Sequence, residues 1–250
     1  MSRWVLTGLK MGTKTTQYPR EQEPRAGVSP GLPITGGAEG RTPEICPTAA
    51  LNTVEGQIAV DYRRCIHCFR CARSSQSAPL DWQPGYEWAA RKADEPVLDS
   101  VTFGRSLNVL VVDAGDCGSC LSETAQLSGP YYNIHRLGFF ITPTPRNADV
   151  LLVVGPVTDQ MRAALKKAYD AMPTPRRVVA AGVCALSGGI FGPSLATGAG
   201  AGDVVPVDVE VPGCPPPPLA ILHGLLVAVG RKPPAAMASP NTIDNVEATP

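Results

Sequence analysis

The second half of the chain carries short, nearly continuous apolar runs separated by longer stretches of helical pattern. Runs of this kind are typical of strands buried on both faces of a parallel sheet. They fall at 107–112, 148–154, 177–181 and, more weakly, 204–207. The helical patterns fall at 119–127, 158–171 and 217–229. Thr158 is placed as an N-cap, and Pro217 or Pro218 suits a first helical turn, where the missing N–H costs nothing. The alternation predicts a doubly wound, mostly parallel, flavodoxin-like α/β sheet over residues 106–232.

The rest of the chain has no sustained period and is rich in Pro, Gly and charged residues. Such composition is typical of turns and irregular segments rather than long helices. We expect four parts here: an extended arm, a small α+β module with four cysteines, a linker and a disordered tail, at 1–40, 41–78, 79–105 and 233–250.

Charge and hydropathy narrow the class of protein. Lys plus Arg number 22, as do Asp plus Glu, so no nucleic-acid partner is indicated. No signal peptide is evident, and no apolar run approaches the roughly 20 residues that span a bilayer. We therefore expect a cytoplasmic location. The apolar residues 4–6 (WVL) leave two interpretations open, namely contact with a membrane or membrane subunit, and simple packing.

Eight cysteines gather in two parts of the chain. Without an export signal, and in a chain long enough to fold without crosslinks, they favour metal binding over disulfides. Cys65, Cys68 and Cys71 form C-x-x-C-x-x-C, which can wrap one face of a 4Fe–4S cluster. Cys46, followed by Pro47, has the form of the Cys-Pro that ends a bacterial ferredoxin run. These four cysteines, the first cysteine group, are predicted to bind one 4Fe–4S cluster.

A comparison within the segment supports this interpretation. In a two-cluster ferredoxin the ligands of the other cluster would fall at Gly36, Glu39, Thr42 and Ser75, none of which is a cysteine. One full ligand set is absent and the other is complete, so the segment resembles a ferredoxin domain that has lost one cluster. The alternative is zinc, which usually takes two separated C-x-x-C pairs.

Other polar residues near the first group are open to several interpretations. His67 is expected to be a surface or neighbouring residue rather than a ligand, because four thiolates suffice. Arg63, Arg64 and Arg70 would raise the cluster potential, bind a partner, or simply form a solvated face.

The remaining cysteines each follow a predicted strand. Cys117 and Cys120 form C-x-x-C after the first strand, Cys184 follows the third, and Cys214 precedes four prolines after the last. The carboxyl ends of strands in an open α/β sheet meet at one crevice. These four, the second cysteine group, are predicted to bind a second 4Fe–4S cluster.

The same stretch resembles a known family. The matching segments are GDCGSCLSE, PRNADVLLVVGPVT, YDAMPTPRRVVA, GVCA…GG and VDVEVPGCPPPP, at 115–123, 145–158, 169–180, 182–189 and 207–218. They are similar to the small subunit of membrane-bound, complex-I-related nickel–iron hydrogenases and to the B subunit of NADH-quinone oxidoreductase. The resemblance implies that Cys117, Cys120, Cys184 and Cys214 hold the cluster nearest a large catalytic subunit.

The resemblance also implies a function and partners. We expect an electron-transfer subunit of an oxidoreductase complex, peripheral on the inner face of the cell membrane, with a large catalytic subunit and membrane subunits as partners. The two residues between Cys117 and Cys120 favour the hydrogenase side, and a quinone-reductase type remains the alternative. Residues 13–19 (TKTTQYP) resemble the start of ferredoxin-like subunits of such complexes, which suggests two merged subunits. No G-x-G-x-x-G follows a predicted strand, and the sequence has no P-loop. The sequence therefore gives no sign of a separate substrate site.

Two charged residues are candidates for supporting the second cluster. Glu123, three residues after Cys120, either relays protons or caps the following helix. Arg146 resembles an arginine near the cluster in complex I relatives, where its charge would stabilise the reduced state; the alternative is an arginine satisfied by a nearby carbonyl or acid.

Overall fold

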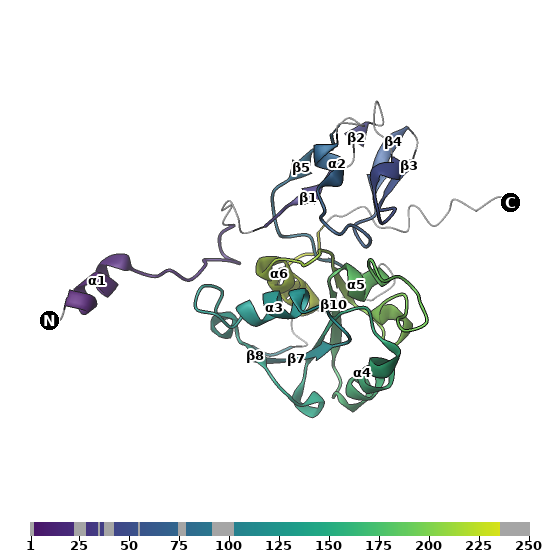
Figure 1. The fold of residues 1–250 in the computed structure, drawn as a ribbon. Helices are drawn as coiled ribbons and strands as arrows, with labels where there is room; N and C mark the ends of the chain where they lie inside the picture. The colour runs from purple at the N-terminus through teal and green to yellow at the C-terminus, as the bar shows by residue number, and fades with distance from the viewer. Residues whose placement is uncertain are drawn as a thin grey trace.

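A computed structural model describes residues 3–22, 29–34, 36–37, 43–54, 56–74, 79–91 and 103–235. They form a six-stranded α/β unit, a small unit that lies against it, and a helix that projects from both (Figure 1). That helix, α1 (Arg3–Met11), has no buried residue and is not predicted by the sequence pattern. Glu39, Thr42 and Ser75, and residues 92–102 and 236–250 of the predicted linker and tail, lie outside the described residues.

The α/β unit is built on a mostly parallel sheet in the order β6-β11-β10-β9-β7-β8. Five neighbouring strands run parallel, and β6 is antiparallel at one edge. The strands are β6 (Ala90–Arg91), β7 (Leu107–Asp113), β8 (Phe139–Ile141), β9 (Val150–Val154), β10 (Arg177–Ala181) and β11 (Val209–Val211). The order of the parallel strands is that of flavodoxin-like folds, which confirms the predicted fold class.

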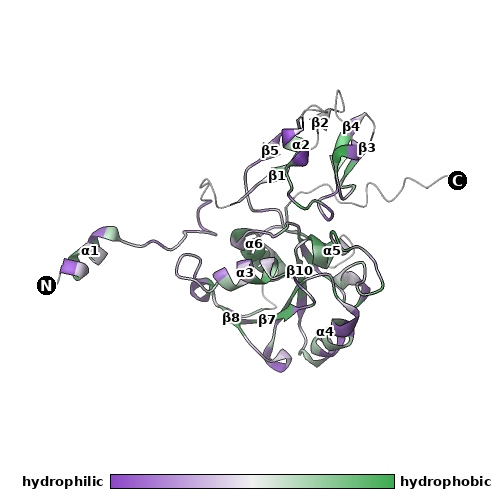
Figure 2. Cartoon of the chain, viewed as in Figure 1, coloured by the Kyte–Doolittle hydropathy of each residue, from purple (hydrophilic) through white to green (hydrophobic). Residues whose placement is uncertain are grey.

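Helices cover both faces of this sheet. They are α3 (Ser119–Gln126), α4 (Asp159–Ala171), α5 (Val183–Ser187) and α6 (Pro218–Ala228). Val150, Leu152 and Val154 of β9 pack in one core with α6, while Leu151 and Val153 pack in a second core with Leu165 of α4 and Leu186 of α5. Every residue of α6 is buried, and Figure 2 shows this helix in green where α4 is partly purple. Burial on both faces explains why these strands read as continuous apolar runs.

Three predicted strands and all three predicted helices are confirmed to within about two residues, but the fourth strand is wrong. Residues 204–207 are a loop after a short 3₁₀ turn (Ala201–Asp203), and the last strand begins at Val209. Pro206 has no N–H for a sheet ladder, and Val205 and Val207 are apolar because they pack in the core as loop residues. Thr158 stands at the N-cap of α4, but its side chain makes no capping hydrogen bond.

The described part of the small unit contains two short sheets and two short helical segments. β2 (Gly36–Gly37), β4 (Gln57–Val60) and β3 (Leu51–Val54) form one sheet, and β1 (Leu32–Pro33) pairs with β5 (Trp82–Gln83). The helical segments are η1 (Pro43–Ile45) and α2 (Arg70–Arg73). Among its described residues, Leu51, Ile58, Val60 and Leu80 form a small buried cluster of their own. The boundaries 41–78 stay a prediction; β1 and β5 lie outside them.

The chain leaves the small unit and enters the main core before β6. Tyr86, Trp88 and Ala89 belong to the same core as α6, and Tyr18 of the amino-terminal arm joins them. Tyr62 packs against both this core and that of the small unit. Within the described part of the chain, no helix has the length and apolar character needed to cross a membrane.

Candidate metal centres

The first cysteine group is assembled from three pieces of the small unit. Cys46 follows η1, Cys65 and Cys68 lie in the loop after β4, and Cys71 is in α2. All four line one cavity, together with apolar side chains that include Ile66, Phe69 and Trp82. The structure therefore brings together the four residues that the spacing predicts, although Cys46 and Cys65 are far apart in the sequence.

The loops around this cavity are tightly curved. Ala49, His67 and Phe69 adopt positive φ angles of 50°, 52° and 59°. This left-handed backbone is uncommon for residues other than glycine and often marks a functional site. One consequence is that the backbone N–H of Ala50 donates to Cys46 Sγ at 3.2 Å. A donor of this kind stabilises negative charge on the sulfur.

Two thiols of the first group, those of Cys65 and Cys71, resist ionisation because they are buried. Burial raises the pKa of Cys65 to about 12, and negative charge on Cys71, Cys46 and Cys68 acts in the same direction. Burial also raises the pKa of Cys71, again with a contribution from Cys68 and Cys46. Buried thiols such as Cys65 and Cys71 become thiolates when they bind positive charge, so a set of four neighbouring cysteines that includes them fits an iron–sulfur cluster.

The second cysteine group lies at the carboxyl ends of the strands. The pairing aligns Asp113 of β7 with Val154 of β9, Val154 with Ala181 of β10, and Ala181 with Val211 of β11. The segments that leave these aligned ends carry the cysteines. Cys117 is in the loop after β7, Cys120 in the first turn of α3, Cys184 in α5, and Cys214 in the loop after β11. The sheet register is therefore what brings together residues from three distant parts of the chain.

Two glycines make room for the sulfurs of this group. Gly182 has φ +91°, and a Cβ there would lie 2.6 Å from Cys120 Sγ. Gly189 has φ +59°, and a Cβ there would lie 2.7 Å from Cys184 Sγ. Both positions need glycine for conformation and for space. The sequence analysis noted glycines near the cysteines, but only the packing identifies these two.

The thiols of the second group are close enough to affect one another's ionisation. Burial raises the pKa of Cys120, and negative charge on Asp116, Cys184, Cys214 and Cys117 raises it further. The pKa of Cys184 is raised to about 11, mainly by burial and to a smaller extent by negative charge on Cys214 and Cys117. Among the described residues, no three His, Cys, Asp or Glu side chains converge as they would around a single metal ion. A 4Fe–4S cluster does not require this convergence, because each of its irons takes a different thiolate.

Three further residues can now be placed. His67 is buried, not on the surface; it makes edge-to-face contacts with the rings of Trp82 and Trp88, and burial lowers its pKa to about 4. Glu123 is half-buried in the second turn of α3, and burial raises its pKa. A capping carboxylate belongs in the first turn, so the cap interpretation does not fit; a proton-relay role stays a prediction.

Arg146 lies at the opposite end of the strands, where β7 and β9 begin. It is exposed in η4 (Pro145–Asn147), before β9. The flanking backbone donates to the start of β7, from Thr142 to Val109 and from Asp149 to Asn108. Cys117 instead follows the end of β7, roughly 13 Å further along the strand. Arg146 is therefore not brought to the second cysteine group, and we assign it no role there.

The geometry defines a class of protein, a flavodoxin-like α/β unit with four thiols at the carboxyl edge of its sheet. The family model for the 20 Kd subunit of NADH ubiquinone oxidoreductase matches residues 117–228, and the chain belongs to this family. An uncharacterised protein of Methanocaldococcus jannaschii is 47% identical over 122 residues, covering 49% of this chain and 82% of that protein.

Two relatives have functional names. A probable membrane-bound hydrogenase subunit of Pyrococcus furiosus is 44% identical over 129 residues, which is 52% of this chain and 77% of the relative. Subunit 7 of formate hydrogenlyase from Escherichia coli is 40% identical over 126 residues, which is 50% of this chain and 49% of that subunit. The similarity thus covers about half of this chain.

Proposed function

We propose that this chain is an iron–sulfur electron-transfer subunit of a membrane-associated oxidoreductase complex of the complex I and nickel–iron hydrogenase type. The observation that carries the proposal is that eight cysteines form two groups of four, on two units that contact each other. A 4Fe–4S cluster takes up and releases single electrons. Cys46, Cys65, Cys68 and Cys71 would hold one such cluster, and Cys117, Cys120, Cys184 and Cys214 the other.

An exposed apolar surface supports a large partner subunit beside the second group. Ile190, Phe191 and Leu195 follow α5 and are 61%, 49% and 101% exposed. Gly189, the preceding residue, lies so near Cys184 that a Cβ there would be 2.7 Å from Cys184 Sγ. Exposed apolar side chains gathered in one segment mark interaction surfaces. A catalytic subunit bound there would exclude water from the site and receive or supply its electrons.

Two observations favour the hydrogenase type over the quinone-reductase type. Two residues separate Cys117 from Cys120, as in hydrogenases, whereas these ligands are adjacent in complex I. The named relatives above are hydrogenase and formate hydrogenlyase subunits. The proposed location is the inner face of the cell membrane, where α1 with its exposed Trp4 and Leu9 would face the membrane subunits.

Metal analysis tests this function directly. The full chain, purified without oxygen, should contain about eight irons and about eight acid-labile sulfides, as two 4Fe–4S clusters require. About four of each would mean that only one group binds a cluster. Zinc without sulfide would contradict the proposal, and the cysteines would then be structural ligands.

A further inference from the structure

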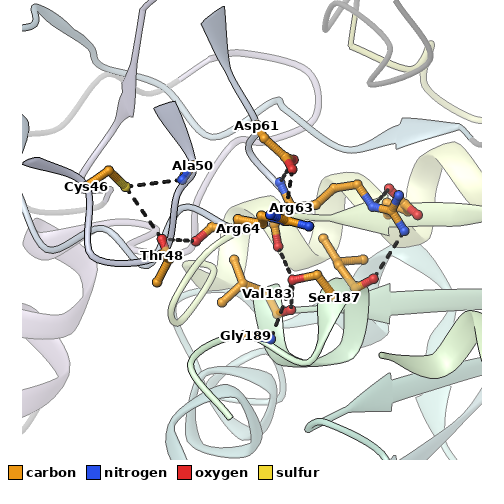
Figure 3. A network of polar contacts seen from close by, with 11 residues as sticks. Cys46, Thr48, Ala50, Asp61, Arg63, Arg64, Val183, Ser187 and Gly189 are labelled. Carbon is orange, nitrogen blue, oxygen red and sulfur yellow. Dashed lines mark hydrogen bonds and ion pairs between the residues drawn. The ribbon is translucent and has the colours of Figure 1, made fainter. Parts of the chain in front are cut away.

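The loop that leads into Cys65 makes a polar contact with the α/β unit. Arg63 Nε lies 3.3 Å from Glu210 Oε2 of β11, and Arg63 Nη2 donates to the carbonyl of Leu186 at 3.1 Å. Both partners belong to the α/β unit, and Leu186 lies two residues after Cys184. Figure 3 shows the Arg63 side chain reaching across this junction. One guanidinium therefore spans from the Cys65 loop to the Cys184 helix.

The backbone of the same residue makes a second connection. Ser187 Oγ lies 2.7 Å from the carbonyl oxygen of Arg63 and 3.1 Å from that of Val183, so its hydroxyl can donate to either (Figure 3). Val183 precedes Cys184 in the chain, and Arg63 precedes Cys65 by two residues. A chain of covalent bonds and one or two hydrogen bonds thus joins a ligand of the first group to a ligand of the second.

Arg64, the next residue, is linked to Cys46 through Thr48. Thr48 Oγ1 donates to the carbonyl of Arg64 at 2.7 Å and lies 3.6 Å from Cys46 Sγ. On the other side of the loop, His67 contacts the ring of Trp88, whose Nε1 donates to the carbonyl of Pro212 at 2.8 Å. Pro212 lies two residues before Cys214. The first group is therefore linked to both carboxyl-terminal ligands of the second group.

We propose that Arg63 is a positioning residue that fixes the separation and orientation of the two clusters by clamping the Cys65 loop onto α5. This inference rests on the proposed function, in which one electron passes between the clusters. That transfer oxidises one cluster by one electron and reduces the other by one, and no bond breaks and no proton moves. Its rate depends on how the two sites are held, and the side chain of Arg63 holds them through two partners at once.

Arginine suits this place better than lysine. Its planar fork presents several donors at fixed angles, so it can meet a carboxylate and a carbonyl together. A lysine ammonium can pair with Glu210 but lacks the fork. Arg64 is the natural control, because it has the same side chain one residue later and pairs with Asp61 of its own unit at 3.5 Å.

The experiment compares the full, two-cluster chain with its Arg63→Ala, Arg63→Lys and Arg64→Ala variants. With both clusters reduced, their magnetic interaction is measured by electron paramagnetic resonance, because it depends on separation and orientation. We expect Arg63→Ala to weaken the interaction while retaining the iron of both clusters, because the backbone contact of Arg63 with Ser187 and the Trp88 contact remain. Arg63→Lys should restore it in part, and Arg64→Ala should match the wild type. The rate at which an electron from an external donor reaches the second cluster should fall roughly tenfold or more in Arg63→Ala.

Other outcomes separate this inference from the function on which it rests. Two clusters whose interaction is the same in Arg63→Ala and Arg64→Ala would refute the role of Arg63 and leave the proposed function standing. A wild-type chain without two clusters would refute the function itself. If Arg63→Ala loses iron, Glu210→Gln replaces it, since this variant removes the negative charge with which Arg63 pairs; an unchanged interaction there would overturn the inference.

Discussion

The small unit and the α/β unit each hold four thiols, but on scaffolds of different strength. In the α/β unit every residue of β9 and β10 is buried, and helices pack on both faces of the sheet. In the part of the small unit that the structure describes, the separate buried cluster has four side chains, and the strands have two to four residues. Burial of apolar area is the main source of folding free energy, so the two sites differ in how much of their shape exists before metal binds.

This difference shows two ways to bring four cysteines together. The second group is positioned by sheet register, which the hydrophobic cores fix without any metal. The first group is positioned by loops whose left-handed residues have only a small core beneath them. When a site lacks a core, the free energy of metal binding becomes part of the free energy of folding.

Removal of iron should give the largest difference between the units. We expect chelation under reducing conditions to abolish the protection of amide hydrogens in β3 and β4. The free energy of opening measured there should fall from a few kcal/mol to nearly zero. Protection in β9 and β10 should remain near its original value. Hydrogen exchange read by mass spectrometry measures both units in one sample. Equal loss in both units would break the comparison.

The next effect concerns function and involves the second group alone. We expect Cys120→Ser to abolish turnover by the whole complex, because serine is a poor ligand for this iron and the last step of electron transfer is lost. The first cluster should remain reducible by an external donor, and the α/β unit should stay folded. Ser122→Ala, on the exposed side of the same helix, is the control. Full turnover in Cys120→Ser would show that electrons leave through the small unit.

The ligand set of the first group is tested by Cys46→Ser. This variant and Cys68→Ser should each lose the same cluster, and the iron content should fall by about half, since one of two 4Fe–4S clusters is lost. Unlike Cys120→Ser, both should also lower the melting temperature of the small unit. If the resonance spectrum of Cys46→Ser still shows both clusters, Cys46 is not a ligand and the comparison with ferredoxins fails.

The smallest expected effect comes from Gly182→Ala. The added Cβ would meet Cys120 Sγ, and the positive φ strains any other residue by about 1–3 kcal/mol. The second cluster should be partly lost or show an altered spectrum, and the first should be unchanged. Gly202→Ala is the matched control, because nothing lies within 4 Å of a Cβ at that position. An equal effect of the two substitutions would mean that close approach at Gly182 does not matter.

The two units also differ in how far the sequence predicted them. In the α/β unit the strands at β7, β9 and β10 were predictable, because burial on both faces leaves a local apolar run. The strand predicted at 204–207 was wrong because Val205 and Val207 are equally buried although they lie in a loop. The two- and three-residue strands β6 and β8 carry too few residues for any pattern. In the small unit the cysteine spacing predicted a site, while the strands around it gave no signal.

The sequence by itself determined the two sets of four cysteines and the order of the main elements, because ligand spacing and apolar periodicity are local properties. The tertiary structure decided which distant residues meet. Arg63 and Leu186 are separated by 123 residues, and no spacing rule relates them. The same holds for Gly182 beside Cys120, and for Arg146, which sheet register carries away from the cysteines. Contacts between units depend on how whole surfaces pack, and a linear pattern does not encode that arrangement.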